Sequence, residues 1–105
     1  MKKFKIFHSS RFDRDLSKLD KSVQDQLDKI EDQLIENPYV GRSLNVRWFR
    51  EKKIGKHRIY YLIYDDYVSL IMVGLSEKRD QQKVINTIRL LFEHFKEELE
   101  RLMED

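Results

Sequence analysis

Residues 46–73 read VRWFREKKIGKHRIYYLIYDDYVSLIMV, a stretch dense in aromatic and β-branched side chains. Such side chains fit the pleated, half-buried surface of a β-sheet. Two short polar breaks, Gly55-Lys56 and Asp65-Asp66, divide the stretch, and residues of these types favour tight turns. The stretch therefore predicts three consecutive antiparallel strands near residues 46–54, 57–64 and 67–73.

The segments on either side of this meander show helical periodicity. Before it, two apolar stripes over residues 12–19 and 23–34 predict a helical hairpin. Residues 3–8 alternate basic and apolar side chains and predict a short strand, whereas residues 38–45 have no periodicity and predict a loop. After the meander, apolar residues at helical spacing over 84–102 predict one long terminal helix.

The predicted order is an N-terminal strand, a helical hairpin, a three-stranded antiparallel meander and a long C-terminal helix, which is an α+β architecture. A chain of 105 residues is expected to form a single domain over residues 1–105. A strand of ~7 residues spans about 23 Å, whereas a helix over 80–103 would be roughly 36 Å long. Residues 93–105 therefore extend the helix beyond the sheet. Their apolar side chains need cover from the chain's own core, from a second copy in a homodimer, or from another protein.

Composition excludes several classes of chemistry. The chain has no cysteine, which rules out disulfides, thiolate zinc sites and thiol nucleophiles. No glycine-rich phosphate loop, metal-ligand spacing or serine nucleophile motif is present, so we expect no metal and no cofactor. No apolar run reaches the ~20 residues of a membrane span, and the first residues do not form a signal core. We expect a cytoplasmic protein without membrane association.

Charge is unevenly distributed although the net charge is only +2. Seven basic residues and one acidic residue lie between positions 42 and 58, whereas six acidic and two basic residues lie from position 93 onward. Cations placed beside Trp48 and Phe49 suit phosphate neutralisation and base stacking, which favours RNA or DNA as a partner. The alternative is a solvated sheet edge that basic side chains protect from aggregation. The basic residues of this stretch are Arg42, Arg47, Arg50, Lys52, Lys53, Lys56 and Arg58.

One histidine stands out within the basic stretch. His57 lies between Lys56 and Arg58, where neighbouring cations favour its neutral form and keep it available as a base. RNA cleavage without a metal needs a base for the 2′-hydroxyl, cations for the phosphorane and an acid for the leaving 5′-oxygen. Residues that can fill these roles, if the meander brings the second basic cluster beside the first, are Lys53, His57, Arg58, Lys78 and Arg79.

Two segments carry a family resemblance. The sequence REKKIGKHRIYY over 50–61 and the sequence SEKRDQQ over 76–82 resemble the RelE/ParE superfamily of type II toxins, and more closely its RelE and HigB-like branches. The element order is also similar to that of the family. The resemblance implies the toxin of a toxin–antitoxin pair. Such a toxin is a metal-independent endoribonuclease that cleaves mRNA, usually at the ribosome, inhibits translation and is neutralised by a small antitoxin.

The resemblance also implies roles for individual residues. Arg58 resembles the strand arginine that contacts the scissile phosphate, and Lys53 resembles the basic residue five positions before it. Arg79 resembles part of the basic pair after the last strand. An alternative role for Arg58 is a salt bridge to Glu51 or Asp80 that locks the sheet. The implied catalytic residues are His57, Arg58, Lys53, Arg79 and Glu51, and the implied RNA-binding residues are Arg47, Arg50, Lys52, Lys56 and Lys78.

Two positions depart from the RelE pattern. Glu51 stands where RelE-type enzymes often have a second basic residue, as in HigB-like members. Ile85 stands where the RelE pattern has a tyrosine. The missing tyrosine gives more weight to His57 or Glu51 as the base. It also keeps open two alternatives: a non-catalytic, ParE-like gyrase inhibitor, and an inactive RelE-fold protein that binds nucleic acid.

Overall fold

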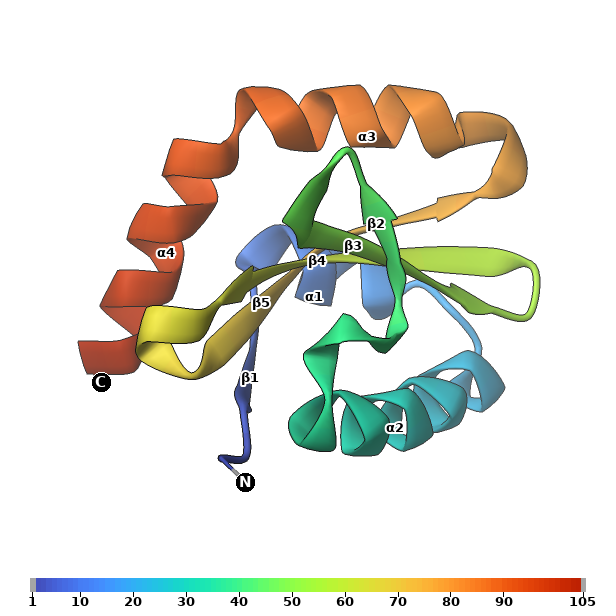
Figure 1. Ribbon diagram of the computed structural model, residues 1–105. Helices are drawn as coiled ribbons and strands as arrows, with labels where there is room; N and C mark the ends of the chain where they lie inside the picture. Colours follow the sequence, from blue (N-terminus) through green and yellow to red (C-terminus); the bar gives the residue numbers. More distant parts are fainter. Residues whose placement is uncertain (1, 105) are drawn as a thin grey trace.

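The computed structural model describes residues 2–104 (Figure 1). Strands and helices follow one another as β1 (Lys5–His8), α1 (Ser10–Leu16), α2 (Lys21–Glu36), β2 (Arg42–Leu44), β3 (Val46–Ile54), β4 (His57–Tyr64), β5 (Ser69–Glu77), α3 (Gln81–Leu90) and α4 (Phe92–Glu104). Three short 3-10 turns, η1 (Pro38–Val40), η2 (Asp65–Tyr67) and η3 (Lys78–Asp80), join some of these elements. Among residues 2–104, no helix is long and apolar enough to cross a membrane.

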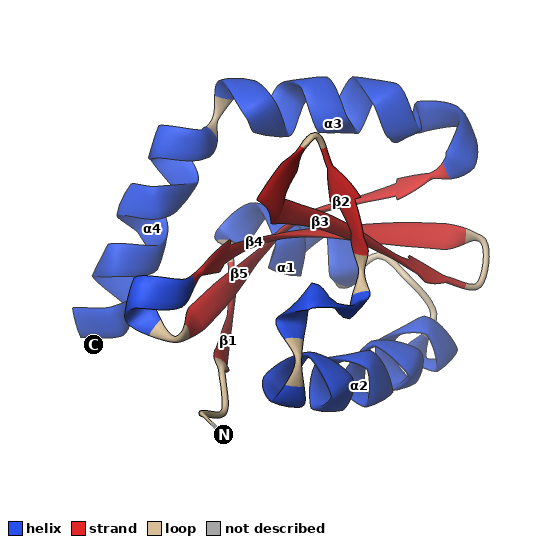
Figure 2. Cartoon of the chain, viewed as in Figure 1, coloured by secondary structure: helices blue, strands red, loops and turns tan. Residues whose placement is uncertain are grey.

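The strands form one sheet in the order β1-β5-β4-β3-β2. Strands β3, β4 and β5 make the predicted antiparallel meander, and β1 pairs with β5 in parallel at the edge of the sheet (Figure 2). In the register of the meander, Lys53 is opposite Arg58, and Arg58 is opposite Ser76. The α+β fold class predicted from the sequence is confirmed.

Helices cover both faces of this sheet. On one face, which we call the α1/α2 face, Phe12 and Leu27 pack with Tyr61 in one hydrophobic core. On the other, the α3/α4 face, Ile88 and Phe95 pack in a second core. Because successive strand side chains point to opposite faces, β4 contributes side chains to both cores. Its residues Ile59, Tyr61 and Ile63 enter the first core, and Tyr60 and Leu62 enter the second.

The C-terminal segment differs from the single long helix predicted over 80–103. Helix α3 ends at Leu90, and Leu91, with φ −113° and ψ 15°, separates it from α4. Helix α4 runs in a different direction from α3 and passes beside η2 (Figure 1), and its Phe95 and Leu99 are 1% and 0% exposed. The bend therefore lets the chain's own core cover Phe95 and Leu99, whereas Met103 near the end of α4 remains 39% exposed. The homodimer remains a prediction, and Asp105 lies outside the described residues.

Two further boundaries differ from the prediction. Residues 42–44 form the edge strand β2 instead of a loop, because Arg42 and Ser43 pair with Glu51 and Arg50 of β3. Strand β5 spans Ser69–Glu77, so it begins two residues later and ends four residues later than the predicted strand over 67–73. Local periodicity carries no signal for a three-residue strand that exists only through its partner.

Candidate functional site

Glu51 is a nearly buried carboxylate on which three elements converge. It lies on β3 with a side chain that is only 8% exposed. Arg42 of β2 donates from Nη2 to both carboxylate oxygens at 3.1 and 3.3 Å, and Gln81 at the start of α3 donates from Nε2 at 2.6 Å. Arg58 of β4 places its Nε 3.7 Å from Oε1. Glu51 thus joins β2, β4 and α3 on the α3/α4 face.

Arg58 is held next to Glu51 without using all of its hydrogen-bond donors. Its side chain is 13% exposed, and the 3.7 Å separation from Glu51 is longer than a hydrogen bond. Across residues 2–104, no buried side-chain nitrogen or oxygen lacks a hydrogen-bond partner. The guanidinium nitrogens of Arg58 that make no hydrogen bond are therefore not completely buried.

Lys53 completes a small cluster with Arg58 and Glu51. It is the ladder partner of Arg58 and lies two residues after Glu51, so it points to the same face of the sheet. Its side chain is exposed, and it has no ion pair among the interactions of the described part of the chain. We call Lys53, Arg58 and Glu51 the cationic cluster: two cations and one carboxylate at one end of the β3–β4 hairpin.

The structure does not bring His57 into this cluster. His57 lies two and four residues before Ile59 and Tyr61 on β4, so its side chain is on the same side of the strand as theirs and points to the α1/α2 face. It lines a hollow of about 210 Å³ together with Asp15 and Leu19 from the other helical layer. Lys52 lies next to Lys53 on β3 and therefore points to the opposite face. It is on the same side as Ile54, which is part of the core beneath α1 and α2.

Arg47 and Arg50 are engaged with protein groups near η1. Arg50 donates to the carbonyl oxygens of Arg47, Tyr39 and Gly41 at 2.8, 3.1 and 2.7 Å. The Arg47 guanidinium lies 4.0 Å from the centre of the Tyr39 ring and 3.0 Å from Asp65. The hydrogen bond from the Tyr39 hydroxyl and then that from Arg47 lower the pKa of Asp65. These two arginines hold the η1 segment against β3.

The second basic segment lies at the same end of the sheet as the cationic cluster. Strand β5 places Ser76 opposite Arg58, and η3, which carries Lys78 and Arg79, follows directly. Lys78 is exposed. Arg79, 82% exposed, lies 3.8 Å from Glu77 and 3.9 Å from Asp80, and exposed pairs of this kind contribute little stability.

Lys56 occupies the β3–β4 turn at this same end. Its Nζ lies 3.9 Å from Glu77, and its side chain is 78% exposed. Because this ion pair is long and exposed, Lys56 can easily exchange Glu77 for another anion. Lys56 and the 78–79 segment therefore add exposed positive charge at the same end of the sheet as the cationic cluster without being part of it.

Two side chains near the cluster offer it no reactive group. The Tyr60 hydroxyl is 2.7 Å from the Ser76 hydroxyl, and burial raises the pKa of Tyr60, as does the nearby charge of Glu51 to a smaller degree. Ile85, at the position where the RelE pattern has a tyrosine, is 5% exposed and belongs to the core. Within residues 2–104, no three His, Asp or Glu side chains are placed to hold a metal ion.

Sequence reasoning missed the contacts of Arg42 and Gln81. The sequence places Arg42 in the basic stretch and predicts a loop there, and it shows Gln81 only as part of the 76–82 motif. Both meet Glu51 through pairing and packing between elements that are far apart in the chain. No local pattern signals such a meeting. A strand assignment for residues 42–44 would have been the only way to find the Arg42 contact.

Comparison with solved structures supports the fold. The chain is similar to a free arginine-to-alanine double mutant of the Escherichia coli toxin RelE, with a TM-score of 0.69 at 20% identity, over 82% of this chain and 93% of that chain. It is also similar to the toxin–antitoxin complex RelBE2 of Mycobacterium tuberculosis, with a TM-score of 0.65 at 20% identity, over 74% and 94%. The intact E. coli RelBE complex matches with a TM-score of 0.64 at 18% identity, over 70% and 95%.

Sequence comparison assigns the family. No curated protein sequence matches the chain. The family model described as the ParE toxin of the type II toxin–antitoxin system parDE matches residues 6–80, a range that contains strands β2 to β5, most of β1 and the cationic cluster. The chain therefore belongs to the ParE toxin family, and it is a RelE/ParE-type toxin of a type II toxin–antitoxin system.

Proposed function

We propose that this toxin is an endoribonuclease that cleaves mRNA at the ribosome without a metal and so inhibits translation. The observation that carries the proposal is the cationic cluster, in which Lys53 and Arg58 flank Glu51 on one face of the sheet. A pair of cations beside a carboxylate combines the groups that bind a phosphate with a group that accepts a proton.

The cluster suggests a division of roles. The scissile phosphate binds to Arg58 and Lys53, and Arg42, which is 64% exposed, turns from Glu51 toward it. Glu51 then takes the proton of the 2′-hydroxyl, and the 2′-oxygen attacks phosphorus. Arg58 stabilises the charge of the phosphorane, and the bond from phosphorus to the 5′-oxygen breaks as Lys53 protonates that oxygen. The products are a 2′,3′-cyclic phosphate and a 5′-hydroxyl.

The proposal includes an antitoxin partner and a cytoplasmic site of action. Two of the similar structures are complexes of a toxin with its antitoxin, and we expect a cognate antitoxin to bind this chain and neutralise it. Messenger RNA and ribosomes are the substrates of the proposed activity, and they place the active toxin in the cytoplasm.

Adjacent residues on opposite faces supply matched controls for a test. Each variant is expressed in cells, growth is followed, and transcripts are mapped by primer extension. We expect Lys53→Ala and Arg58→Ala to reduce cleavage by about 10²–10³-fold, as loss of a transition-state donor does. Lys52→Ala and His57→Ala, which alter the α1/α2 face, are expected to leave cleavage within a few-fold of the parent.

The neighbouring variants make the result decisive. Equal loss of cleavage in all four variants would contradict a site on the α3/α4 face. Circular dichroism of each purified variant, compared with that of the parent, separates loss of the fold from loss of activity.

A second candidate function is inhibition of DNA gyrase by a non-catalytic, ParE-like toxin. The ParE family match favours it, as does Glu51, whose carboxylate already accepts hydrogen bonds from Arg42 and Gln81. This function predicts growth arrest with intact transcripts and altered plasmid supercoiling. An inactive family member would produce neither effect.

A further inference from the structure

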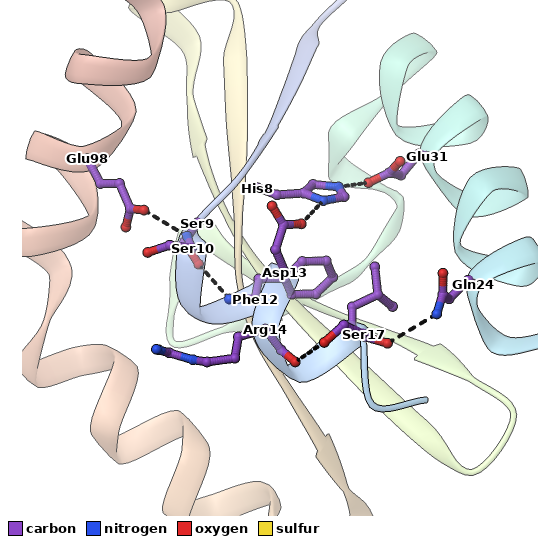
Figure 3. Close-up of polar contacts among 11 residues, drawn as sticks. His8, Ser9, Ser10, Phe12, Asp13, Arg14, Ser17, Gln24, Glu31 and Glu98 are labelled. Atoms are coloured by element: carbon purple, nitrogen blue, oxygen red, sulfur yellow. Dashed lines mark hydrogen bonds and ion pairs between the residues drawn. The ribbon is translucent and has the colours of Figure 1, made fainter. Parts of the chain in front are cut away.

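His8 is held between two carboxylates from different helices. Its Nδ1 lies 2.7 Å from Asp13 Oδ1 of α1, and its Nε2 lies 2.5 Å from Glu31 Oε2 of α2. Figure 3 shows the ring between these two carboxylates, with Phe12 beside it; the ring centroids of His8 and Phe12 are 4.9 Å apart. One side chain on β1 therefore connects the sheet edge to both members of the helical hairpin.

Only the protonated ring fits this geometry. A neutral imidazole has one N–H donor and one acceptor nitrogen, whereas an imidazolium donates from both nitrogens. An acceptor nitrogen facing a carboxylate at these distances is repulsive, so both contacts are favourable only when the ring carries its proton. The His8 side chain is 25% exposed and that of Glu31 17%, which limits screening of the pair by water.

The surroundings of His8 favour its positive charge. Burial alone lowers the pKa of His8, but the hydrogen bonds and charges of Glu31 and Asp13 outweigh burial and raise it above 6.5. Strand β5 places the uncharged Met72 beside it. The other charged groups near this edge are Asp28, Asp32 and Lys5, which line a groove with Glu31, and Glu98 of α4, which accepts a hydrogen bond from the backbone N–H of Ser10 at 2.8 Å.

We propose that His8 is a proton-operated clamp that fastens α1 and α2 to the β1 edge of the sheet. When the ring is protonated, it joins Asp13 to Glu31. When the ring loses its proton, one of the two contacts is lost, and α1 or α2 is held less firmly. The clamp lies on the α1/α2 face, so it is independent of the cationic cluster and of the proposed nuclease activity.

The clamp predicts a definite direction of pH dependence. Because the pKa of His8 is raised on folding, the clamp stabilises the folded state fully below pH 6.5 and loses this effect as pH rises through the folded-state pKa. Between these two values the folded chain binds up to one more proton than the unfolded chain. The folding equilibrium constant is then expected to fall by at most about tenfold per pH unit.

Two measurements on the full chain test the clamp. The first is NMR titration of the three histidine rings, assigned with His57→Gln and His94→Gln. The second is urea denaturation from pH 5.5 to 9 of the parent, of His8→Gln and of His94→Gln as the matched control. We expect His8 to titrate above pH 6.5 and the loss of stability with rising pH to disappear in His8→Gln only. Faster amide exchange in α2 at high pH would locate the effect.

The contrary results are equally clear. A His8 ring that titrates at or below pH 6.5 overturns the clamp, as does an unchanged pH slope in His8→Gln. If His8→Gln fails to fold, NMR titration of the His8 ring in the parent and in Glu31→Gln still tests the clamp. The proposal requires Glu31→Gln to move the titration of His8 to lower pH, and an unmoved titration contradicts it.

Discussion

Replacing Tyr61 by phenylalanine tests how the chain before β2 is held. Tyr61 is fully buried on β4, and its hydroxyl donates to the carbonyl oxygen of Pro38 at 2.7 Å and accepts from the backbone N–H of Gly41 at 3.2 Å. Burial raises the pKa of Tyr61 to about 12, so the hydroxyl stays neutral. It is a bridge from the sheet to η1, the segment that leads into β2 and Arg42.

The expected cost follows from the groups that the substitution leaves behind. Phenylalanine fills almost the same space, so the loss comes from hydrogen bonding and not from a cavity. Tyr61→Phe leaves a carbonyl at Pro38 and an N–H at Gly41, both in buried residues, without this partner. Each unsatisfied buried group costs about 1–3 kcal/mol. We therefore expect the free energy of unfolding to fall by about 2–6 kcal/mol in total.

Urea denaturation followed by circular dichroism measures this change. The matched control is Tyr39→Phe, which removes a hydroxyl that is bonded at 2.6 Å to the exposed Asp65 and is expected to cost no more than about 1 kcal/mol. A Tyr61→Phe variant within about 0.5 kcal/mol of the parent, the usual range of neutral surface changes, would refute the bridging role. So would equal losses in Tyr61→Phe and Tyr39→Phe.

Three further predictions concern the core, a turn and the cationic cluster. Phe95→Ala, at a side chain that is 1% exposed, should lower the free energy of unfolding by about 3–5 kcal/mol, whereas Leu90→Ala, at 87% exposure, should change it by less than about 0.5 kcal/mol in the same denaturation assay. Gly55→Ala should cost about 1–2 kcal/mol, because Gly55 has φ +54° in the β3–β4 turn; a neutral result would mean that the turn relaxes. Glu51→Ala should lower the melting temperature more than Lys53→Ala does, because it leaves the nearly buried Arg58 without its counter-charge, and equal melting temperatures would contradict that pairing.

Local sequence was informative wherever an element is defined by its own residues. The bounds predicted for β3 and β4, 46–54 and 57–64, are those of the structure, because Gly55-Lys56 breaks an otherwise continuous run of strand-forming residues. The N-terminal strand and the helical hairpin were predicted for the same reason. The terminal helix was predicted as one element because the apolar stripe over 84–102 continues through Leu91 and carries no sign of a bend.

The candidate site was predicted only in part. Alternation along the strands places Lys53 and Arg58 on one face of the sheet and His57 on the other. The three residues are candidates for one site by their closeness in the sequence, which does not take this alternation into account. Charge patterns do not reveal that Arg50 donates to backbone carbonyl oxygens or that Arg47 contacts Tyr39 and Asp65, and the RNA-binding role of these two arginines stays a prediction. No local pattern indicates the contacts of His8, since its two carboxylate partners lie 5 and 23 residues away.

The amino-acid sequence by itself determined the types and order of the main elements, the absence of cysteine chemistry and the concentration of cations in one stretch, because periodicity and composition are local properties. The tertiary structure decided which side chains meet: Glu51 with Arg42 and Gln81, and His8 with Asp13 and Glu31. Strand register and the docking of helices on the two faces set these meetings. They depend on how the whole core packs, so no short window of sequence contains them.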